Sequence, residues 1–229
     1  RLMDIGSNLK HIREEIAAVA AKANRDPSAI RLVAVSKHKA ASDIEEAAAA
    51  GQLIFGENYV QELAAKASEV SCPVEWNFIG HLQSNKVRQI AGLVSMIHSV
   101  DRLSLAQEID RQWGKIGKRC DILVQVNVSG ETTKSGITAD DATALIKEIA
   151  TLPHLNVRGL MTMPPFFDAP ERARPYFREL KELADAISRG GIPGVSMDEL
   201  SMGMSGDFKV AIEEGATLVR IGTAIFGER

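Results

Sequence analysis

Short apolar runs rich in β-branched residues alternate with longer segments of helical periodicity along the whole chain. Apolar runs of four to eight residues bounded by polar residues, Gly or Pro are typical of buried strands. We expect eight strands, at residues 32–36, 53–56, 76–79, 96–100, 122–128, 157–161, 199–202 and 218–221. Because strands that alternate with helices form parallel sheets, the pattern predicts eight βα units.

The segments between these runs carry apolar residues three and four positions apart, as in residues 105–113, which predicts amphipathic helices. Residues 42–45 have the spacing of a capping box and residues 138–141 its acidic variant, so helices are expected to begin there. One further helix precedes the first strand, with Leu9, Ile12, Ile16 and Val19 on one face. We expect this helix to cover the bottom or the flank of the sheet.

Eight units in 229 residues predict an α/β fold, a (β/α)8 TIM barrel with an extra N-terminal helix. Alternation alone does not distinguish a closed barrel from an open, doubly wound sheet, which remains the alternative. Neither a Gly/Ser/Pro-rich linker nor a shift in composition divides the chain, so we expect a single domain over residues 1–229.

The charge balance restricts the partners. With 27 basic and 30 acidic residues the net charge is -3, and no basic field is available for nucleic acid. Cys72 and Cys120 form no CxxC pair, the first residues lack the apolar region of a signal peptide, and no apolar run reaches the roughly 20 residues that cross a bilayer. We expect a soluble cytoplasmic protein. The five histidines form no HxxxH or HExxH pair, so no metal site is predicted.

Polar residues recur where the predicted strands end, which is where (β/α)8 barrels place their chemistry. They are Lys37, Glu57, Asn58, His81, Asn127, Ser201, Gly222 and Thr223. Residues 201–205 contain a Gly turn that leads into a helix, and together with Gly222 and Thr223 this turn predicts a phosphate cup between the last two strands. The recurrence indicates a ligand site at the mouth of the barrel.

Two cations among these strands are candidates for contact with a ligand, and each has a structural alternative. Period-two alternation puts Lys37 on the face of Val33 and Val35, and a desolvated neutral amine there is a nucleophile toward an aldehyde. The alternative is a strand-end lysine that extends into water. Arg220 interrupts the apolar run 218–222 and needs an acceptor, either a structural carboxylate or a ring nitrogen or anion of a bound ligand.

Seven motifs, in order along the chain, closely resemble those of the pyridoxal phosphate homeostasis protein family. They are LVAVSK at 32–37, FGENYVQE at 55–62, FIGHLQSNK at 78–86, KSGI at 134–137, GLMTMP at 159–164, LSMGMS at 200–205 and RIGTAIFG at 220–227. The resemblance implies a barrel of fold type III, similar to the N-terminal domain of alanine racemase, that binds pyridoxal 5′-phosphate (PLP).

By motif position, the resemblance implies that Lys37 forms a Schiff base with PLP and that Arg220 faces the pyridine nitrogen. Ser201, Ser205, Gly222 and Thr223 are then expected around the phosphate. Asn58 and His81 match positions near the cofactor. The role of Lys134 stays open.

Two functions from different classes follow from this resemblance. In the first, the protein is a monomeric, non-enzymatic carrier or buffer in intracellular PLP homeostasis, with PLP-dependent apo-enzymes as partners. In the second, it is an amino-acid racemase or a related PLP-dependent enzyme. A racemase needs a base on each face of its substrate, and neither Tyr59 nor Tyr176 sits where the added domain of alanine racemase supplies the second base. We therefore favour the carrier, with no catalytic residue.

Overall fold

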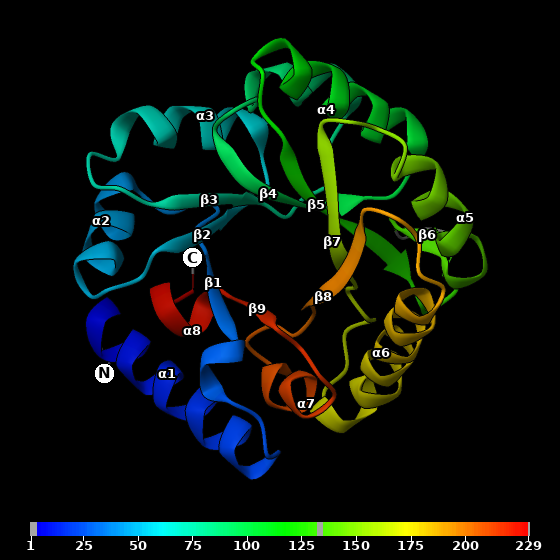
Figure 1. Cartoon of the computed structure of the whole chain (residues 1–229). Coiled ribbons are helices and arrows are strands. Elements are labelled where there is room, and N and C mark those ends of the chain that lie inside the picture. The colour runs from blue at the N-terminus through cyan, green and yellow to red at the C-terminus, as the bar shows by residue number, and fades with distance from the viewer. Residues whose placement is uncertain (1–3, 132–134, 229) are drawn as a thin grey trace.

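Eight parallel strands close into a barrel in the computed structural model, which describes residues 4–131 and 135–228 (Figure 1). They are β1 (Arg31–Val35), β2 (Ile54–Glu57), β3 (Glu75–Phe78), β4 (Val94–Val100), β5 (Cys120–Asn127), β7 (Leu155–Met161), β8 (Val195–Ser201) and β9 (Leu218–Ile221). The order around the sheet is β4-β3-β2-β1-β9-β8-β7-β5, and pairing of β4 with β5 closes the ring. This closure confirms the TIM barrel over the doubly wound sheet. A two-residue strand, β6 (Ile137–Thr138), extends β5.

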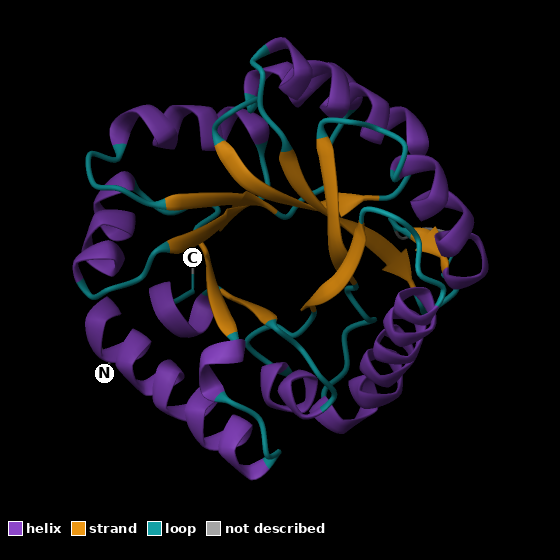
Figure 2. Cartoon of the chain, in the orientation of Figure 1, coloured by secondary structure: helices purple, strands orange, loops and turns teal. Residues whose placement is uncertain are grey.

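Helices form the outer ring around these strands (Figure 2). They are α1 (Ile5–Lys22), α2 (Ala41–Ala49), α3 (Val60–Glu69), α4 (Leu103–Lys115), α5 (Ala139–Ile149), α6 (Arg174–Arg189), α7 (Phe208–Glu213) and α8 (Thr223–Phe226), with 3₁₀ turns η1 (Pro27–Ala29), η2 (Ser84–Gln89) and η3 (Pro170–Ala173). Only the η2 turn joins β3 to β4. In the part of the chain described, no helix is long and apolar enough to span a membrane.

The extra helix α1 lies on the flank of the barrel and not beneath it. Its buried face carries Leu9, Ile12 and Ile16, as the periodicity predicts, and packs against α2, α7 and α8. Asn8 donates a 2.8 Å hydrogen bond to the Ile225 carbonyl at the other end of the chain. The helix therefore joins the first and last units of the barrel (Figure 1).

Of the two expected helix starts, one is confirmed and one is wrong by two residues. Thr138 caps α5, and its Oγ1 accepts the Asp141 N–H as expected. Helix α2 begins at Ala41 and not after Ser42, because Asp43 accepts the backbone N–H of Ala40 at 3.3 Å. An acidic residue in the first turn thus replaces the expected serine cap.

The strands bury both faces, which is why they read as nearly continuous apolar runs. One face packs under the helices, and the other fills the barrel with an apolar cluster of Val33, Ile54, Met96, Leu123, Met161 and Leu218. Strands β7 and β8 approach closely at Gly159, where a Cβ would lie 1.7 Å from the Glu199 carbonyl oxygen. Polar side chains are also buried in this interior, among them Asn77, His98, Ser201 and Arg220.

Candidate functional site

A cavity of about 440 Å³ opens at the carboxyl ends of β1, β7, β8 and β9. Its polar lining includes Lys37, Ser205, Arg220, Gly222 and Thr223, five of the residues predicted from the sequence. Its apolar wall comes from the loop 163–167 after β7. The volume lies in the range of small-molecule sites, and parallel strands bring these distant segments to one edge.

Lys37 follows β1 in a turn closed by a 3.0 Å hydrogen bond from Lys39 N to the Ser36 carbonyl. Its side chain is half-buried, and among the described residues its amine has no hydrogen-bond or ion-pair partner. Lys39, the other lysine of the cavity, donates to the Gly227 carbonyl at 3.2 Å. The next residue, His38, has a φ of 62°, which is uncommon outside glycine. Lys37 is therefore the lysine of the cavity with a free amine.

The turn that carries Lys37 is held from below by Lys66 of α3. The Lys66 amine is buried and donates to the Ser36 carbonyl at 2.6 Å, to Glu57 Oε2 at 3.1 Å and to Glu62 Oε1 at 2.6 Å. Glu57 also accepts from the Ser36 hydroxyl, and burial raises the pKa of its carboxyl group. With three acceptors, the Lys66 amine is fully engaged and serves as a structural cation.

Arg220 forms the inner wall of the cavity and is 3% exposed. Its Nη1 donates to Ser201 Oγ at 2.5 Å and its Nη2 to the Thr162 carbonyl at 3.1 Å. Burial lowers the pKa of the guanidinium to about 10, and the Asp207 carboxylate partly opposes this shift. No carboxylate bonds to Arg220 among residues 4–131 and 135–228, so the structural carboxylate considered from the sequence does not anchor it.

The turn at the end of β8 lies beside Arg220, whose backbone N–H donates to the Gly203 carbonyl at 2.9 Å. Gly203 has a φ of 101°, and a Cβ there would lie 2.7 Å from the Ala211 Cβ. Asp207 Oδ1 accepts the Met204 N–H at 2.7 Å and fixes the turn. The hydroxyl oxygens of Ser205 and Thr223 then lie 3.5 Å apart. Two hydroxyls this close can contact one tetrahedral anion, as the predicted cup requires.

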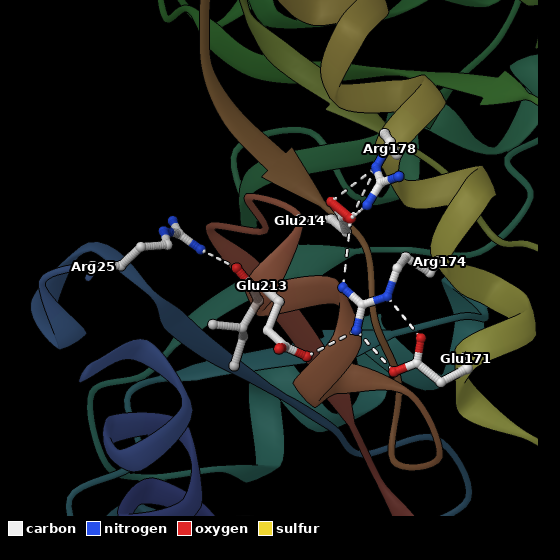
Figure 3. Close-up of polar contacts among 7 residues, drawn as sticks. Arg25, Glu171, Arg174, Arg178, Glu213 and Glu214 are labelled. Atoms are coloured by element: carbon white, nitrogen blue, oxygen red, sulfur yellow. Dashed lines mark hydrogen bonds and ion pairs between the residues drawn. The ribbon is translucent and has the colours of Figure 1, made fainter. Parts of the chain in front are cut away.

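An ion-pair cluster on the outside of the barrel fixes α7, which follows this turn (Figure 3). Arg174 of α6 pairs with Glu171, Glu213 and Glu214 at 2.7, 3.1 and 3.5 Å. Arg178 adds a 2.6 Å contact to Glu214. From the other side of α7, Arg25 donates to the Ile212 carbonyl at 2.8 Å. The cluster attaches α7 to its neighbours and so restrains the turn.

Three predicted residues lie outside the cavity. Asn58 and His81 line a separate hollow of about 500 Å³ on the side of β2 and β3, together with Tyr59 and Lys86. Ser201 is fully buried, and its hydroxyl meets Arg220 and His98. This geometry favours a role for Ser201 in holding Arg220 over direct phosphate contact. Cofactor contacts of Asn58 and His81 stay predictions.

Several residues of the site were not anticipated from the sequence. Lys66 shows only a Glu62–Lys66 spacing typical of a surface helix pair, and nothing in it indicates contact with Ser36. His98 was grouped with the scattered histidines, although its place two residues after Met96 puts both on one strand face. Lys134 lies outside the described residues. Among those described, no group of three or more His, Cys, Asp and Glu residues has the arrangement of a metal site.

Comparisons with known proteins agree with this geometry. The sequence model of the family described as alanine racemase, N-terminal domain, matches residues 7–229. Proteins named pyridoxal phosphate homeostasis protein are 43% identical over 228 residues in Aquifex aeolicus, covering 99% of each chain, and 45% identical over 228 residues in Pseudomonas aeruginosa, covering 98% of this chain and 96% of that one.

Solved structures show the same barrel. PipY of Synechococcus elongatus, solved with PLP bound, is 36% identical, covers 94% of this chain with 100% of its own, and superposes with a TM-score of 0.83. Alanine racemase of Corynebacterium glutamicum is 17% identical with a TM-score of 0.72, and the match covers 96% of this chain and 62% of the racemase. At that identity the racemase likeness shows the fold alone.

Proposed function

Because the chain belongs to the pyridoxal phosphate homeostasis protein family, built on the alanine racemase N-terminal barrel, we propose that it holds PLP as a Schiff base on Lys37 and acts as a PLP carrier or buffer. One observation carries the assignment of Lys37. Its amine is unpaired among the described residues and lines the same cavity as a buried, anchored arginine. Lys39 and Lys66 are both engaged with protein acceptors.

The residues present fit this cofactor. PLP supplies an aldehyde that condenses reversibly with an amine, releasing water, and an anionic phosphate. Lys37 provides the amine. Arg220 provides a buried cation with no carboxylate bonded to it in the described chain, which a ring nitrogen or an anion would satisfy. The hydroxyls of Ser205 and Thr223 and the backbone at Gly222 provide donors for the phosphate.

A carrier must hold its ligand reversibly and need not transform it. An amine–aldehyde bond held by one lysine can exchange with amines of other proteins, so PLP-dependent apo-enzymes are the recipients we propose, with the protein acting as a monomer inside the cell. A racemase instead moves a proton between two faces of its substrate, with a base on each. Of the described titratable groups around the cavity, Lys39 and Asp207 are each bonded to backbone, and Lys37 alone is free.

The proposal is tested by mixing the protein with PLP, reducing with borohydride and mapping the labelled peptide. We expect the label on Lys37, loss of the label in Lys37→Ala, and retention in the matched control Lys39→Ala. A label mainly on Lys39 or another lysine of the native protein would contradict the assignment.

A second experiment separates the carrier from an enzyme. We expect the loaded protein to restore an apo-enzyme faster than PLP dissociates spontaneously, and to leave the α-hydrogen of alanine unexchanged in deuterium oxide. Exchange at about 1 per second or faster, lost in Lys37→Ala, would overturn the carrier assignment. Recovery of the apo-enzyme no faster than spontaneous release would limit the role to buffering.

A further inference from the structure

Four buried polar side chains and the exposed Ser95 form a continuous hydrogen-bond chain across the barrel, starting at Arg220. Arg220 Nη1 lies 2.5 Å from Ser201 Oγ, Ser201 Oγ lies 2.9 Å from His98 Nδ1, and His98 Nε2 lies 2.7 Å from Asn77 Oδ1. Asn77 Nδ2 donates to Ser95 Oγ at 3.2 Å, and Ser95 donates to the Trp76 carbonyl at 3.3 Å. The chain thus joins strands β9, β8, β4 and β3 across the barrel.

One direction of donation satisfies every donor in this chain. A guanidinium can only donate, so Ser201 Oγ accepts from Arg220. The single hydroxyl hydrogen of Ser201 is then left for His98 Nδ1, which must be the acceptor. His98 therefore carries its hydrogen on Nε2 and donates to Asn77 Oδ1. The Asn77 amide in turn donates to Ser95, and all donors point away from Arg220.

The opposite direction leaves one donor of the chain unpaired. If His98 carried a hydrogen on Nδ1, both His98 and Arg220 would donate to Ser201, and the serine hydrogen would have no partner among the described residues. A doubly protonated His98 would also place a second positive charge beside Arg220 in the barrel. Burial and the Arg220 charge accordingly lower the pKa of His98 well below its usual value.

Stability alone does not account for this chain. The surrounding interior is apolar, with Met96 two residues before His98 and Leu218 two residues before Arg220 in the same cluster. Apolar side chains at positions 77, 98 and 201 would fill this core without hydrogen bonds to satisfy. One end of the hydrogen-bond chain is Arg220, which lines the cavity. At the other end, Asn77 and Ser95 line a charged hollow of about 250 Å³.

We infer that His98 is a positioning residue for Arg220: as the neutral Nε2–H tautomer it keeps Ser201 as an acceptor and so holds the guanidinium in its cavity-facing orientation. The inference rests on the proposed function, because the orientation matters where Arg220 faces the cofactor ring. Thr162 fixes the second guanidinium nitrogen through its carbonyl. His98 does not touch the cavity and acts through Ser201.

The first test uses the protein without PLP. Long-range ¹H–¹⁵N spectra of ¹⁵N-histidine-labelled protein, assigned with His98→Gln, report which ring nitrogen carries the hydrogen. We expect the Nε2–H tautomer, neutral at pH 7. An Nδ1–H tautomer or an imidazolium would overturn the inference. This result does not depend on PLP binding, whereas failure to label Lys37 would overturn the proposed function alone.

The second test compares three variants by PLP affinity and by the absorption band of the bound cofactor. His98→Leu removes the chain and is expected to raise the Kd for PLP on the order of tenfold and to shift the band. His98→Gln, whose amide can accept from Ser201 and donate to Asn77, should restore both. Met96→Ala is the matched control, because it removes volume from the same strand face and takes away no side-chain hydrogen bond of the chain.

Core damage by itself would act on all variants alike. Met96→Ala is expected to lower the melting temperature but keep the wild-type band and affinity. If His98→Leu kept them too, or if His98→Gln failed to recover them while remaining folded, the positioning role would be wrong.

Discussion

The phosphate cup makes a quantitative prediction about ligand selectivity. Thr223→Val keeps the shape of the side chain and removes its hydroxyl, and Ser205→Ala does the same on the facing wall. Hydrogen bonds to charged groups contribute about 1.5 to 3 kcal/mol each. Thr223 is exposed at the mouth, where water competes, so the lower figure applies. Each variant should therefore raise the Kd for PLP about tenfold.

The two substitutions are expected to combine non-additively. Their hydroxyl oxygens lie 3.5 Å apart, close enough to contact one phosphate, and groups that share a partner couple energetically. Pyridoxal, which lacks the phosphate, provides the internal reference. Neither variant should change the affinity for pyridoxal, so the preference for PLP over pyridoxal falls by the same factor as the PLP affinity.

Spectrophotometric titration of both ligands against the wild type, the two variants and their combination measures these factors. Ser68→Ala is the control, because Ser68 is an exposed serine whose hydroxyl bonds only to the Ala65 carbonyl of its own helix. Equal binding of pyridoxal and PLP by the wild type, or variants that weaken both ligands equally, would refute the cup.

Three further predictions concern the scaffold. Gly159→Ala should prevent folding or cost ~3 kcal/mol or more in urea unfolding, because its Cβ would meet the Glu199 carbonyl oxygen at 1.7 Å; unchanged stability would contradict the close approach of β7 and β8. The pKa of His98 is lowered in the folded protein, so the contribution of neutral His98 to the unfolding free energy is complete above the unfolded pKa of 6.5 and is lost as the pH falls below it. Below pH 6.5 the unfolding free energy of the wild type should therefore decline more steeply with falling pH than that of His98→Gln, by up to ~1.4 kcal/mol per pH unit. Parallel curves would exclude a buried neutral histidine. Arg174→Met should lower the unfolding free energy by about 1 kcal/mol or less, and high salt should reduce this loss. A larger loss that does not depend on salt would mean that packing and not charge holds α7.

The sequence predicted the fold well because both faces of the barrel strands are buried. All eight runs became strands, since a parallel strand between helices and the barrel interior needs apolar residues at nearly every position. The largest boundary error is β8, which begins at Val195 and not at residue 199. Its first four residues alternate apolar and polar side chains and none is fully buried, so they lack the continuous apolar run that marks the other strands. Closure depends on β4 meeting β5, a contact that no local pattern encodes.

The candidate site was predicted in part, and the division has a physical reason. Strand-end residues such as Lys37 and Thr223 converge because parallel strands end at one edge, which alternation and motif order reveal. Contacts across the barrel are different. His98 and Ser201 are 103 residues apart, and no periodicity shows which interior side chains meet. Asn58 and His81, expected near the cofactor from the family resemblance, line the neighbouring hollow, and their contacts with the cofactor stay predictions.

The buried polar groups also bear on how ligand and fold depend on each other. A folded core ordinarily pairs its charges, yet Arg220 lies inside this one with only neutral oxygens bonded to it in the described chain. Lowering of its pKa to about 10 by burial means that the empty protein bears a cost for keeping this cation charged. A ligand that places a lone pair or an anion against Arg220 removes part of that cost and binds only the folded state. The same residue that weakens the apo barrel therefore favours occupancy, which suits a protein whose proposed task is to hold PLP until an acceptor takes it.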